Sequence, residues 1–335
     1  MRRSVMFLLF VFLIFFFFSK NNYKKEYVLR GETMGSIPYT IKFVSDFESV
    51  NKNEIDSILI SFNNIFSTYI KNSEISKINR SKGKIQISNY FFLMLKKSRE
   101  IFEDTNGAYD PTIGPLVNAW GFGPNKKLIQ PSSKKIRDLL NYVGFDKLDF
   151  DNDSIYKEYQ ETYIDFSSIA KGYAVDLISK FLSQKGINNY FVEIGGEVKA
   201  SGLNLSDNYW LVGIEKPIDN LNVDIIATIP LNNLSLATSG NYRNYYESND
   251  SIIYHTIDPK SGYPSNSNML SASVFAESCM VADAYATAFM VLNFNKSKEI
   301  LDSSTNLEGF FVYKENGQIH TYSSQNIRSI INLYE

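Results

Sequence analysis

The stretch that decides the fold is ESCMVADAYATAFMVLN, Glu277 to Asn293, near the carboxyl end of the chain. Apolar residues occur on every side of the helix that this composition predicts, so we expect the helix to be buried. It nevertheless carries Asp283 and Thr287. Four residues advance a helix by roughly 400°, so these two side chains are expected about 40° apart on one face.

A carboxylate and a hydroxyl on a buried face allow two interpretations. A buried carboxylate is costly unless it is paired or binds a metal. Asp283 could be satisfied by a neighbouring side chain, with the Thr287 hydroxyl bonded to a carbonyl of its own helix. The two oxygen atoms could instead bind Mg²⁺, which prefers carboxylates, carbonyls and water. The spacing alone leaves both interpretations open.

The composition is that of an ordinary globular protein. The chain has 335 residues with a formal net charge of -2, and 44% of the residues are hydrophobic and 21% charged. Because the charge is close to neutral, nothing supports a surface for nucleic acid, and no nucleic-acid partner is expected. Cys279 is the single cysteine, which excludes an intramolecular disulfide.

The amino-terminal segment predicts export. Two arginines precede an unbroken apolar run from Val5 to Phe18, and a lysine-rich stretch follows. This is the layout of a signal peptide or a short signal anchor, which we assign to residues 1–25. We expect the protein at the bacterial cytoplasmic membrane, with its catalytic domain on the periplasmic side. Cleavage of the segment stays open, and no cysteine near Ser19 provides a lipoprotein anchor.

The rest of the chain, 26–335, is expected to form a single domain, because no linker or repeat divides it. Periodicity and turn residues predict helices over 53–69, 90–107, 132–144, 170–186 and 277–292. Strands are predicted within 38–44, 189–202, 209–215, 223–231 and 308–322. Helices and strands are interleaved, but the strand pairs read as hairpins, so we predict an α+β fold with mainly antiparallel strands.

Two segments are suited to a ligand. GAYDPTIGPLVNAWGFGP, 107–124, is rich in glycine, proline and aromatic residues, so we predict a rigid wall that is neither helix nor strand. A purely structural loop is the alternative. IDFSSIAKGYAVD, 164–176, places Asp165 and Lys171 at the start of a helix, where free N–H groups and a lysine favour phosphate. A capped helix with a surface lysine is the alternative there.

Three further segments carry weaker signals. VEIGGE, 192–197, has paired glycines that would let a backbone approach a ligand, and LATSGNYRNYYE, 236–247, predicts a Ser-Gly turn after a strand, followed by an arginine. YHTIDPKSGYP, 254–264, contains His255 between a strand and an Asp-Pro turn. Loop residues often carry function, although a lone histidine is more often structural.

In this order, these segments resemble the ApbE family, the FAD:protein FMN transferases. The matching blocks run from about Gly31 to Asn293, and they include GETMGSIPYTIKF, FSTYIKNSEISKIN, GAYDPTIGPLVNAWGFGP, IDFSSIAKGYAVD, VEIGGEVKASG, LATSGNYRNYY, HTIDPKSGYP and VADAYATAFMVLN. The resemblance implies an ApbE-like domain and Mg²⁺-dependent transfer of FMN from FAD to a Ser or Thr hydroxyl of a target protein, with AMP released.

The resemblance also assigns roles to individual residues. The flavin would be bound by Met34, Tyr69, Ala108, Tyr109 and Asp110. The remaining parts of FAD would be contacted by Asp165, Lys171, Glu193, Gly195, Gly196, Ser239 and Arg243. Mg²⁺ would be bound by Asp283, Thr287 and the backbone carbonyl of Ala170. His255 would contact FAD at the reacting phosphorus and act as the catalytic base, although Asp258 could orient the substrate instead.

The sequence departs from the family pattern in three places. Ser36 stands where the family usually has threonine, Ser167 and Ser168 stand where glycines are common, and the lipoprotein cysteine is missing. The acceptor is expected among subunits of redox complexes or exported flavoproteins. Hydrolysis of FAD to FMN and AMP, or FAD binding without catalysis, are the alternative functions.

Overall fold

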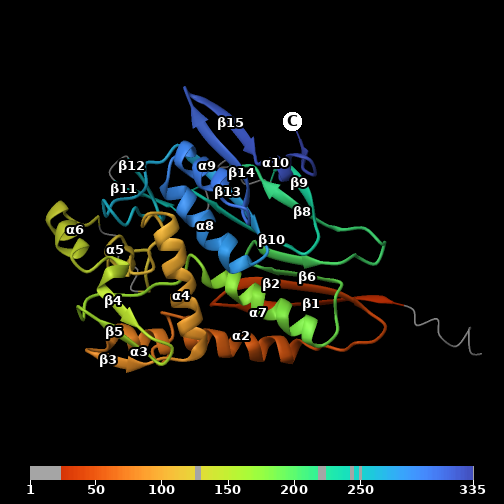
Figure 1. Cartoon of the computed structure of the whole chain (residues 1–335), viewed down its shortest axis with the longest axis horizontal. Helices are drawn as coiled ribbons and strands as arrows, with labels where there is room; N and C mark the ends of the chain where they lie inside the picture. The colour runs from red at the N-terminus through yellow and green to blue at the C-terminus, as the bar shows by residue number, and fades with distance from the viewer. Residues whose placement is uncertain (1–23, 125–129, 218–223, 242–244, 249–250, 335) are drawn as a thin grey trace, which may run out of the picture.

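An eight-stranded sheet forms the centre of the molecule (Figure 1). The computed structural model describes residues 24–124, 130–217, 224–241, 245–248 and 251–334. Its sheet has the order β1-β2-β6-β7-β10-β13-β14-β15, and all these neighbours pair antiparallel. The strands are β1 (Lys25–Thr33), β2 (Ile37–Ser45), β6 (Tyr190–Ile194), β7 (Glu197–Ser201), β10 (Leu234–Gly240), β13 (Met269–Ala276), β14 (Glu308–Glu315) and β15 (Gln318–Ser323).

Helices cover one face of this sheet. Helix α7 packs on β6 and β7, α8 packs on β10 and β13, and the two helices pack against each other (Figure 1). The largest apolar cluster fills the space between the sheet and the helices. The helices are α2 (Lys52–Phe66), α3 (Glu74–Arg80), α4 (Asn89–Asp104), α5 (Gly114–Ala119), α6 (Ser133–Leu140), α7 (Ala170–Gln184), α8 (Cys279–Val291), α9 (Phe294–Ser303) and α10 (Gln325–Arg328), with a 3-10 turn at Phe145–Lys147.

The opposite face of the sheet is covered by a small sheet of order β16-β9-β8. Because side chains alternate along a strand, Val274 of β13 packs toward the helices while Phe275 packs toward the small sheet. Two further small sheets have the orders β3-β5-β4 and β11-β12. The remaining strands are β3 (Lys84–Gln86), β4 (Leu148–Phe150), β5 (Ser154–Lys157), β8 (Trp210–Glu215), β9 (Ile225–Leu231), β11 (Tyr245–Ser248), β12 (Ser251–Tyr254) and β16 (Asn332–Leu333).

The predicted α+β class is confirmed, as is the buried helix, which forms α8. The two predicted hairpins are present as β6–β7 and β14–β15. Two local predictions are wrong. The segment 107–124 does contain a helix, α5, because Pro115 stands in its first turn, where a missing N–H costs nothing. Ser239 and Gly240 form no turn, because β10 continues through them and pairs with β13.

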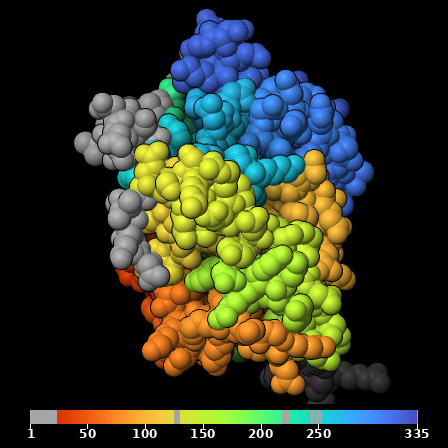
Figure 2. Space-filling model, turned by 90° about the vertical axis from the view of Figure 1, so that its left-hand side faces the viewer, coloured from red at the N-terminus to blue at the C-terminus, as the bar shows by residue number. Residues whose placement is uncertain are grey.

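The predicted signal segment lies almost wholly outside the described residues, which begin at residue 24. Within the part of the chain that the structure describes, no helix is both long and apolar enough to span a membrane. The face turned toward the viewer in Figure 2 is built from all parts of the chain, with the middle third between the two ends. Segments distant in sequence therefore meet at one side of the molecule.

Candidate active site

The site is built around Asp283, at the junction of α7 and α8. Its side chain is buried, with 3% of the residue exposed. The backbone N–H of Gly172, in the first turn of α7, donates to Asp283 Oδ2 at 3.0 Å. Burial raises the pKa of this carboxyl group, while the Lys171 ammonium and the Gly172 N–H oppose the rise. The predicted helix therefore buries its carboxylate where a backbone amide and a cation partly compensate for lost water.

Thr287 follows Asp283 by about one turn of α8 and is half-buried. Its hydroxyl lies 3.4 Å from Ser239 Oγ, which projects from β10 beneath the helix. The arrangement agrees with the predicted common face of Asp283 and Thr287. It also brings Ser239, predicted to contact FAD, next to Thr287, predicted as a metal ligand.

The start of α7 offers a carbonyl group that the sequence did not single out. The amide of Gly172 donates to Asp283 rather than to the carbonyl oxygen four residues earlier, which belongs to Ser168. Ser168 also lies close to Tyr109, as its effect on the pKa of that hydroxyl shows. Ala170 is the first helical residue, where carbonyls enter the helix's own hydrogen-bonding ladder. The Ser168 carbonyl therefore does not receive the Gly172 N–H, which makes it a candidate ligand in addition to the predicted Ala170 carbonyl.

Lys171 carries the positive charge of the junction. Its Nζ lies 2.6 Å from Glu197 Oε2, and Glu197 is buried at the start of β7. Glu193, at the other side of the β6–β7 turn, accepts the N–H of Gly196 at 2.8 Å. Burial raises the pKa of Glu193, and the Gly196 N–H and Lys171 oppose this rise. Lys171 is thus shared among several carboxylates.

The turn between Glu193 and Glu197 requires glycine. Gly195 and Gly196 have φ values of 58° and 95°, in the left-handed region that other residues avoid. A Cβ on Gly195 would lie 2.6 Å from the Ile37 side chain and 3.4 Å from Lys171 Cδ. The close approach at Gly195 is made to the protein's own chain, and the approach to a ligand stays a prediction.

The glycine- and aromatic-rich segment supplies buried residues rather than an open wall. Ala108, Tyr109 and Asp110 are 5%, 1% and 6% exposed. The Tyr109 hydroxyl lies 2.9 Å from Ser98 Oγ of α4. Burial raises the pKa of Tyr109, and the Asp283 charge adds to the rise, which places this ring near the junction.

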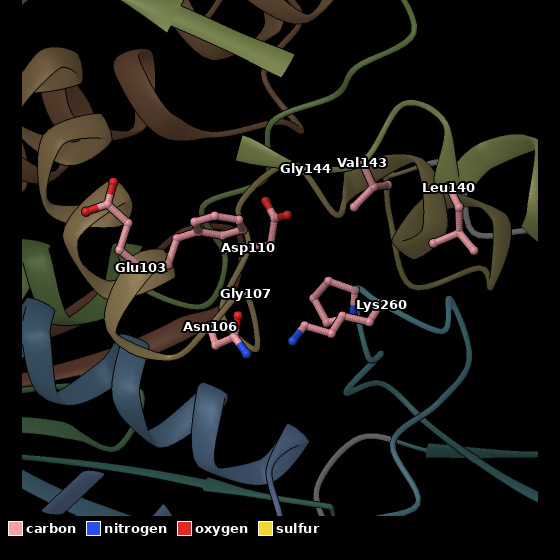
Figure 3. Close-up of a pocket in the computed structure, with 10 residues that line it drawn as sticks. Glu103, Asn106, Gly107, Asp110, Leu140, Val143, Gly144 and Lys260 are labelled. Atoms are coloured by element: carbon pink, nitrogen blue, oxygen red, sulfur yellow. The ribbon is translucent and has the colours of Figure 1, made fainter. Parts of the chain in front are cut away.

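Asp110 is held within its own turn. Its Oδ1 accepts the backbone N–H of Thr112 at 2.8 Å and the Thr112 hydroxyl at 2.6 Å, and that hydroxyl in turn accepts the Gly144 N–H. Burial raises the pKa of Asp110 to about 6, although the Thr112 donors oppose the rise. The carboxyl group lines a pocket of about 470 Å³. Figure 3 shows it and the Lys260 side chain on opposite sides of that space.

Asp165 is positioned by the same segment. Its N–H donates to the carbonyl oxygen of Pro111 at 2.7 Å, and its Oδ1 accepts the N–H of Ser167 at 2.8 Å. Burial raises the pKa of the Tyr69 hydroxyl, and the negative charge of Asp165 adds to the rise. Tyr69 therefore lies near Asp165. Since 63% of Tyr69 is exposed, its ring is available to a ligand.

Met34 occupies the β1–β2 turn with a φ of 50° and packs against the largest apolar cluster. Few residues adopt this conformation, so the turn between Thr33 and Ile37 is held by its surroundings. Arg243 lies outside the described residues.

His255 directly follows β12 and is half-buried. Its ring lies edge-on to Phe122 of the aromatic segment, with 6.3 Å between ring centroids. The indole N–H of Trp120 donates to the carbonyl oxygen of Gly262 at 2.9 Å, which connects this segment to the His255 loop.

Asp258 accepts the backbone N–H groups of Lys260 and Ser261, so its carboxylate stabilises its own turn. The choice between His255 and Asp258 as the base stays a prediction.

The described residues contain no cluster of three or more His, Cys, Asp or Glu side chains that could hold a metal ion. The donor set at the junction is of another kind, with one carboxylate, one hydroxyl and one backbone carbonyl. These are hard oxygen ligands, which suit Mg²⁺ when water completes the shell.

Comparison with known proteins identifies the family. The ApbE family model matches residues 34–311. A Haemophilus influenzae protein named FAD:protein FMN transferase is 37% identical over 309 residues, covering 88% of this chain and 89% of that protein. An Escherichia coli K12 protein of the same name is 34% identical over 316 residues, covering 91% and 89%.

Solved structures agree with this result. The flavin transferase ApbE from Vibrio cholerae superposes with a TM-score of 0.83 at 32% identity, covering 92% of this chain and 99% of that one. The apo form of the Pseudomonas stutzeri flavinyl transferase ApbE gives a TM-score of 0.83 at 32% identity, covering 92% and 97%. The likeness extends over nearly the whole described fold, and the chain belongs to the ApbE family.

Proposed function

We propose that this chain is an Mg²⁺-dependent FAD:protein FMN transferase, which moves FMN from FAD to a Ser or Thr hydroxyl of a target protein and releases AMP. The observation that carries the proposal is the buried carboxylate of Asp283 beside Lys171 and Thr287, in a chain that resembles named FAD:protein FMN transferases along most of its length. A pyrophosphate substrate needs positive charge around it. The junction supplies one cation, Lys171, and hard oxygen ligands that would bind a second cation, Mg²⁺.

The residues at the junction fit Mg²⁺. Asp283 has its Oδ2 anchored by the Gly172 amide, so the carboxylate is held in one orientation before a metal arrives. Thr287 and a carbonyl at the start of α7 would complete the protein ligands. The resemblance assigns that carbonyl to Ala170, and the hydrogen bond of the Gly172 N–H to Asp283 makes the Ser168 carbonyl a second candidate. When bound, Mg²⁺ would neutralise charge on the pyrophosphate oxygens.

The chain's own residues would hold the substrate in position for transfer. Lys171 would bind phosphate oxygens, with Glu197 fixing its side chain in the unliganded protein. Tyr69 and Met34 would contact the flavin, and Glu193 would lie toward the adenosine part. Positioning and charge stabilisation carry most of the catalysis in such displacements at phosphorus.

The reaction would be a displacement at the FMN-side phosphorus. The acceptor hydroxyl oxygen forms a bond to this phosphorus, the bond to the bridging oxygen breaks, and AMP leaves with that oxygen. His255 would accept the hydroxyl proton, since a histidine can take up a proton near neutral pH. No covalent intermediate with the enzyme is required.

The direct test is mass spectrometry of an acceptor protein after incubation with the enzyme, FAD and Mg²⁺. The proposal expects the acceptor to gain the mass of FMN, with one AMP released for each modification. AMP released at the same rate without acceptor would make the protein an FAD pyrophosphatase. Tight FAD binding without either product would make it a flavin-binding protein.

We also propose where the enzyme works. The segment 1–25 would direct the domain formed by 26–335 to the periplasmic side of the cytoplasmic membrane, where its acceptor would be a redox-complex subunit or an exported flavoprotein. The Arg2 and Arg3 flank and the apolar run that follows support this. Protease added to intact spheroplasts is expected to digest the domain. Protection until the cells are lysed would contradict export.

A further inference from the structure

Asp176 is a half-buried charge that the proposed mechanism does not use. It lies on α7, one turn after Gly172, and 17% of its side chain is exposed. Its Oδ1 accepts the backbone N–H of Cys279 at 3.0 Å, and its Oδ2 accepts the N–H of Met280 at 3.0 Å. The Ser278 hydroxyl donates to Oδ2 at 2.7 Å. A carboxylate of α7 therefore binds the first backbone amides of α8.

Lys199 completes the set of donors to this carboxylate. Its Nζ lies 3.1 Å from Asp176 Oδ1 and also donates to the carbonyl oxygen of Glu277 at 2.8 Å. Lys199 belongs to β7, which lies under α7. The carboxylate thus joins three elements, and its negative charge also suits the amino-terminal end of α8.

The arrangement is reciprocal. Asp176 of α7 accepts amides from the first turn of α8, and Asp283 of α8 accepts the Gly172 amide from the first turn of α7. The paired positions 172 with 283 and 176 with 279 show that the two helices run in opposite directions. Two carboxylates fix both ends of one contact, so α8 can neither slide along α7 nor rotate on it without losing these bonds.

Close backbone packing also holds α8 in place against α7. A Cβ placed on Gly172 would lie 2.2 Å from the carbonyl oxygen of Cys279, so no side chain separates the helices there. Cys279 and Asp283 are one helical turn apart. A displacement of the first turn of α8 would therefore move Asp283 by a similar amount.

We propose that Asp176 is a positioning residue for the transfer reaction, which sets α8 against α7 so that Asp283 and Thr287 keep the geometry needed to bind Mg²⁺. The inference rests on the proposed function. Asp176 would not touch the substrate or the metal itself. It would act through the amides of Cys279 and Met280, in the way that supporting hydrogen bonds orient metal ligands.

The test is an Asp176→Asn variant, which keeps the size of the side chain but replaces one acceptor oxygen with a donor group. Mg²⁺ is titrated into the purified protein with FAD present and acceptor absent, and the melting temperature is followed. The Mg²⁺ concentration at half-maximal shift is expected to rise about 10- to 100-fold over that of the unmodified protein. The same rise is expected for half-maximal transfer.

Asn293→Ala is the matched control. Asn293 caps the next helix, α9, through a 3.0 Å bond to the Lys296 amide, and it takes no part in the junction. Its loss is expected to lower the melting temperature by weakening a helix cap, with the Mg²⁺ midpoint within twofold of the unmodified value. A purely structural Asp176 would give the same pattern as this control.

The outcomes separate the two proposals. An Asp176→Asn midpoint within twofold of the unmodified protein overturns the positioning role, and so does an equal shift in Asn293→Ala. If Asp176→Asn does not fold, Ser278→Ala removes one of the donors instead, and it should raise the midpoint at least threefold. An unchanged midpoint there overturns the role as well. An unmodified protein that neither responds to Mg²⁺ nor transfers FMN overturns the proposed function together with it.

Discussion

Two buried aspartates in this protein are held in different ways. Asp283, in the α7–α8 junction, takes its amide from Gly172, which is 111 residues away in the chain. Asp110 takes its donors from Thr112, two residues away. Lys171 reduces the electrostatic cost of burying Asp283, whereas the nearby charge of Asp146 increases that of Asp110.

The difference separates two kinds of buried charge. Asp110 takes its hydrogen-bond donors from its own segment and keeps a carboxyl group with a pKa of about 6, whose charge is uncompensated at neutral pH. The junction at Asp283 forms only when two helices meet, and it has a cation beside it. A charge that is compensated from distant segments is suited to a ligand-binding function, and a charge held only by local hydrogen bonds is suited to shaping a loop.

Replacing the junction carboxylate should have the largest effect on activity. Asp283→Asn keeps an acceptor for the Gly172 amide but removes the negative charge, so the fold should persist while Mg²⁺-dependent transfer falls on the order of 10⁴-fold. The measurement is the transfer rate across an Mg²⁺ series. Normal turnover at limiting Mg²⁺ would show that Asp283 is only a satisfied core residue, and the contrast with Asp110 would then disappear.

The aromatic segment is tested through His255, which lies against Phe122. His255→Ala should lower transfer by roughly 10²- to 10⁴-fold, the usual contribution of a positioned base, and the rate should lose its pH dependence near neutrality. FAD affinity and melting temperature should change little, because the junction is untouched. A loss of transfer that weaker FAD binding fully explains would remove His255 from the mechanism.

The pH dependence of stability tests how Asp110 differs from Asp283. Its folded pKa, about 6, lies above the usual value of 3.8, so the folded protein holds this proton more tightly than the unfolded chain. Stability from this group is therefore present below pH 4 and is lost as the pH rises through 6. Asp110→Asn keeps both Thr112 bonds and should raise the free energy of unfolding by up to about 3 kcal/mol at pH 7.5.

Urea unfolding of Asp110→Asn and the unmodified protein at pH 7.5 and pH 4.5 measures this difference. The advantage of the variant should shrink to roughly a third at the lower pH. Equal stabilisation at both values would mean that Asp110 is not a buried, uncompensated charge. Transfer by Asp110→Asn should depend on Mg²⁺ as it does in the unmodified protein, in contrast to transfer by Asp283→Asn.

The smallest effect is expected where the two helices touch. Gly172→Ala should stabilise an isolated helix, but here the added Cβ meets the backbone at Cys279. We expect a loss of about 1–3 kcal/mol from overpacking. Ser183→Ala, on the exposed side of α7, is the control and should be close to neutral. A Gly172→Ala protein as stable as this control would show that the junction can open at little cost.

The sequence predicted the parts of the site that depend on local spacing. Asp283 and Thr287 share a face because four residues separate them, and Lys171 lies at a helix start because the preceding residues read as a turn. The α+β class followed from hairpin-like strand pairs. The prediction that the glycine- and proline-rich segment 107–124 contains no helix is wrong, because Pro115 in a first helical turn is compatible with the short α5.

What could not be predicted depends on segments that meet only in the folded protein. Nothing local in KGYAVD shows that Asp176 accepts the amides of α8. Nor does it show that the Gly172 N–H donates to Asp283 and not to the Ser168 carbonyl. The buried Lys157 likewise donates to carbonyls of Asn79, Gln160 and Thr162, a cradle that no sequence pattern suggests. For Asp176, the available signal is an ionisable residue within an otherwise apolar helix.

The shared position of Lys171 has a consequence for the order of binding. Among the described side chains at the junction, Lys171 faces Glu197 directly and also acts on Glu193 and Asp283, so several acidic groups share this cation. A pyrophosphate that engages Lys171 would take this cation from those groups unless a divalent ion compensates them. If Mg²⁺ binds as proposed, it and FAD must bind cooperatively, and each must raise the affinity of the other by the same factor.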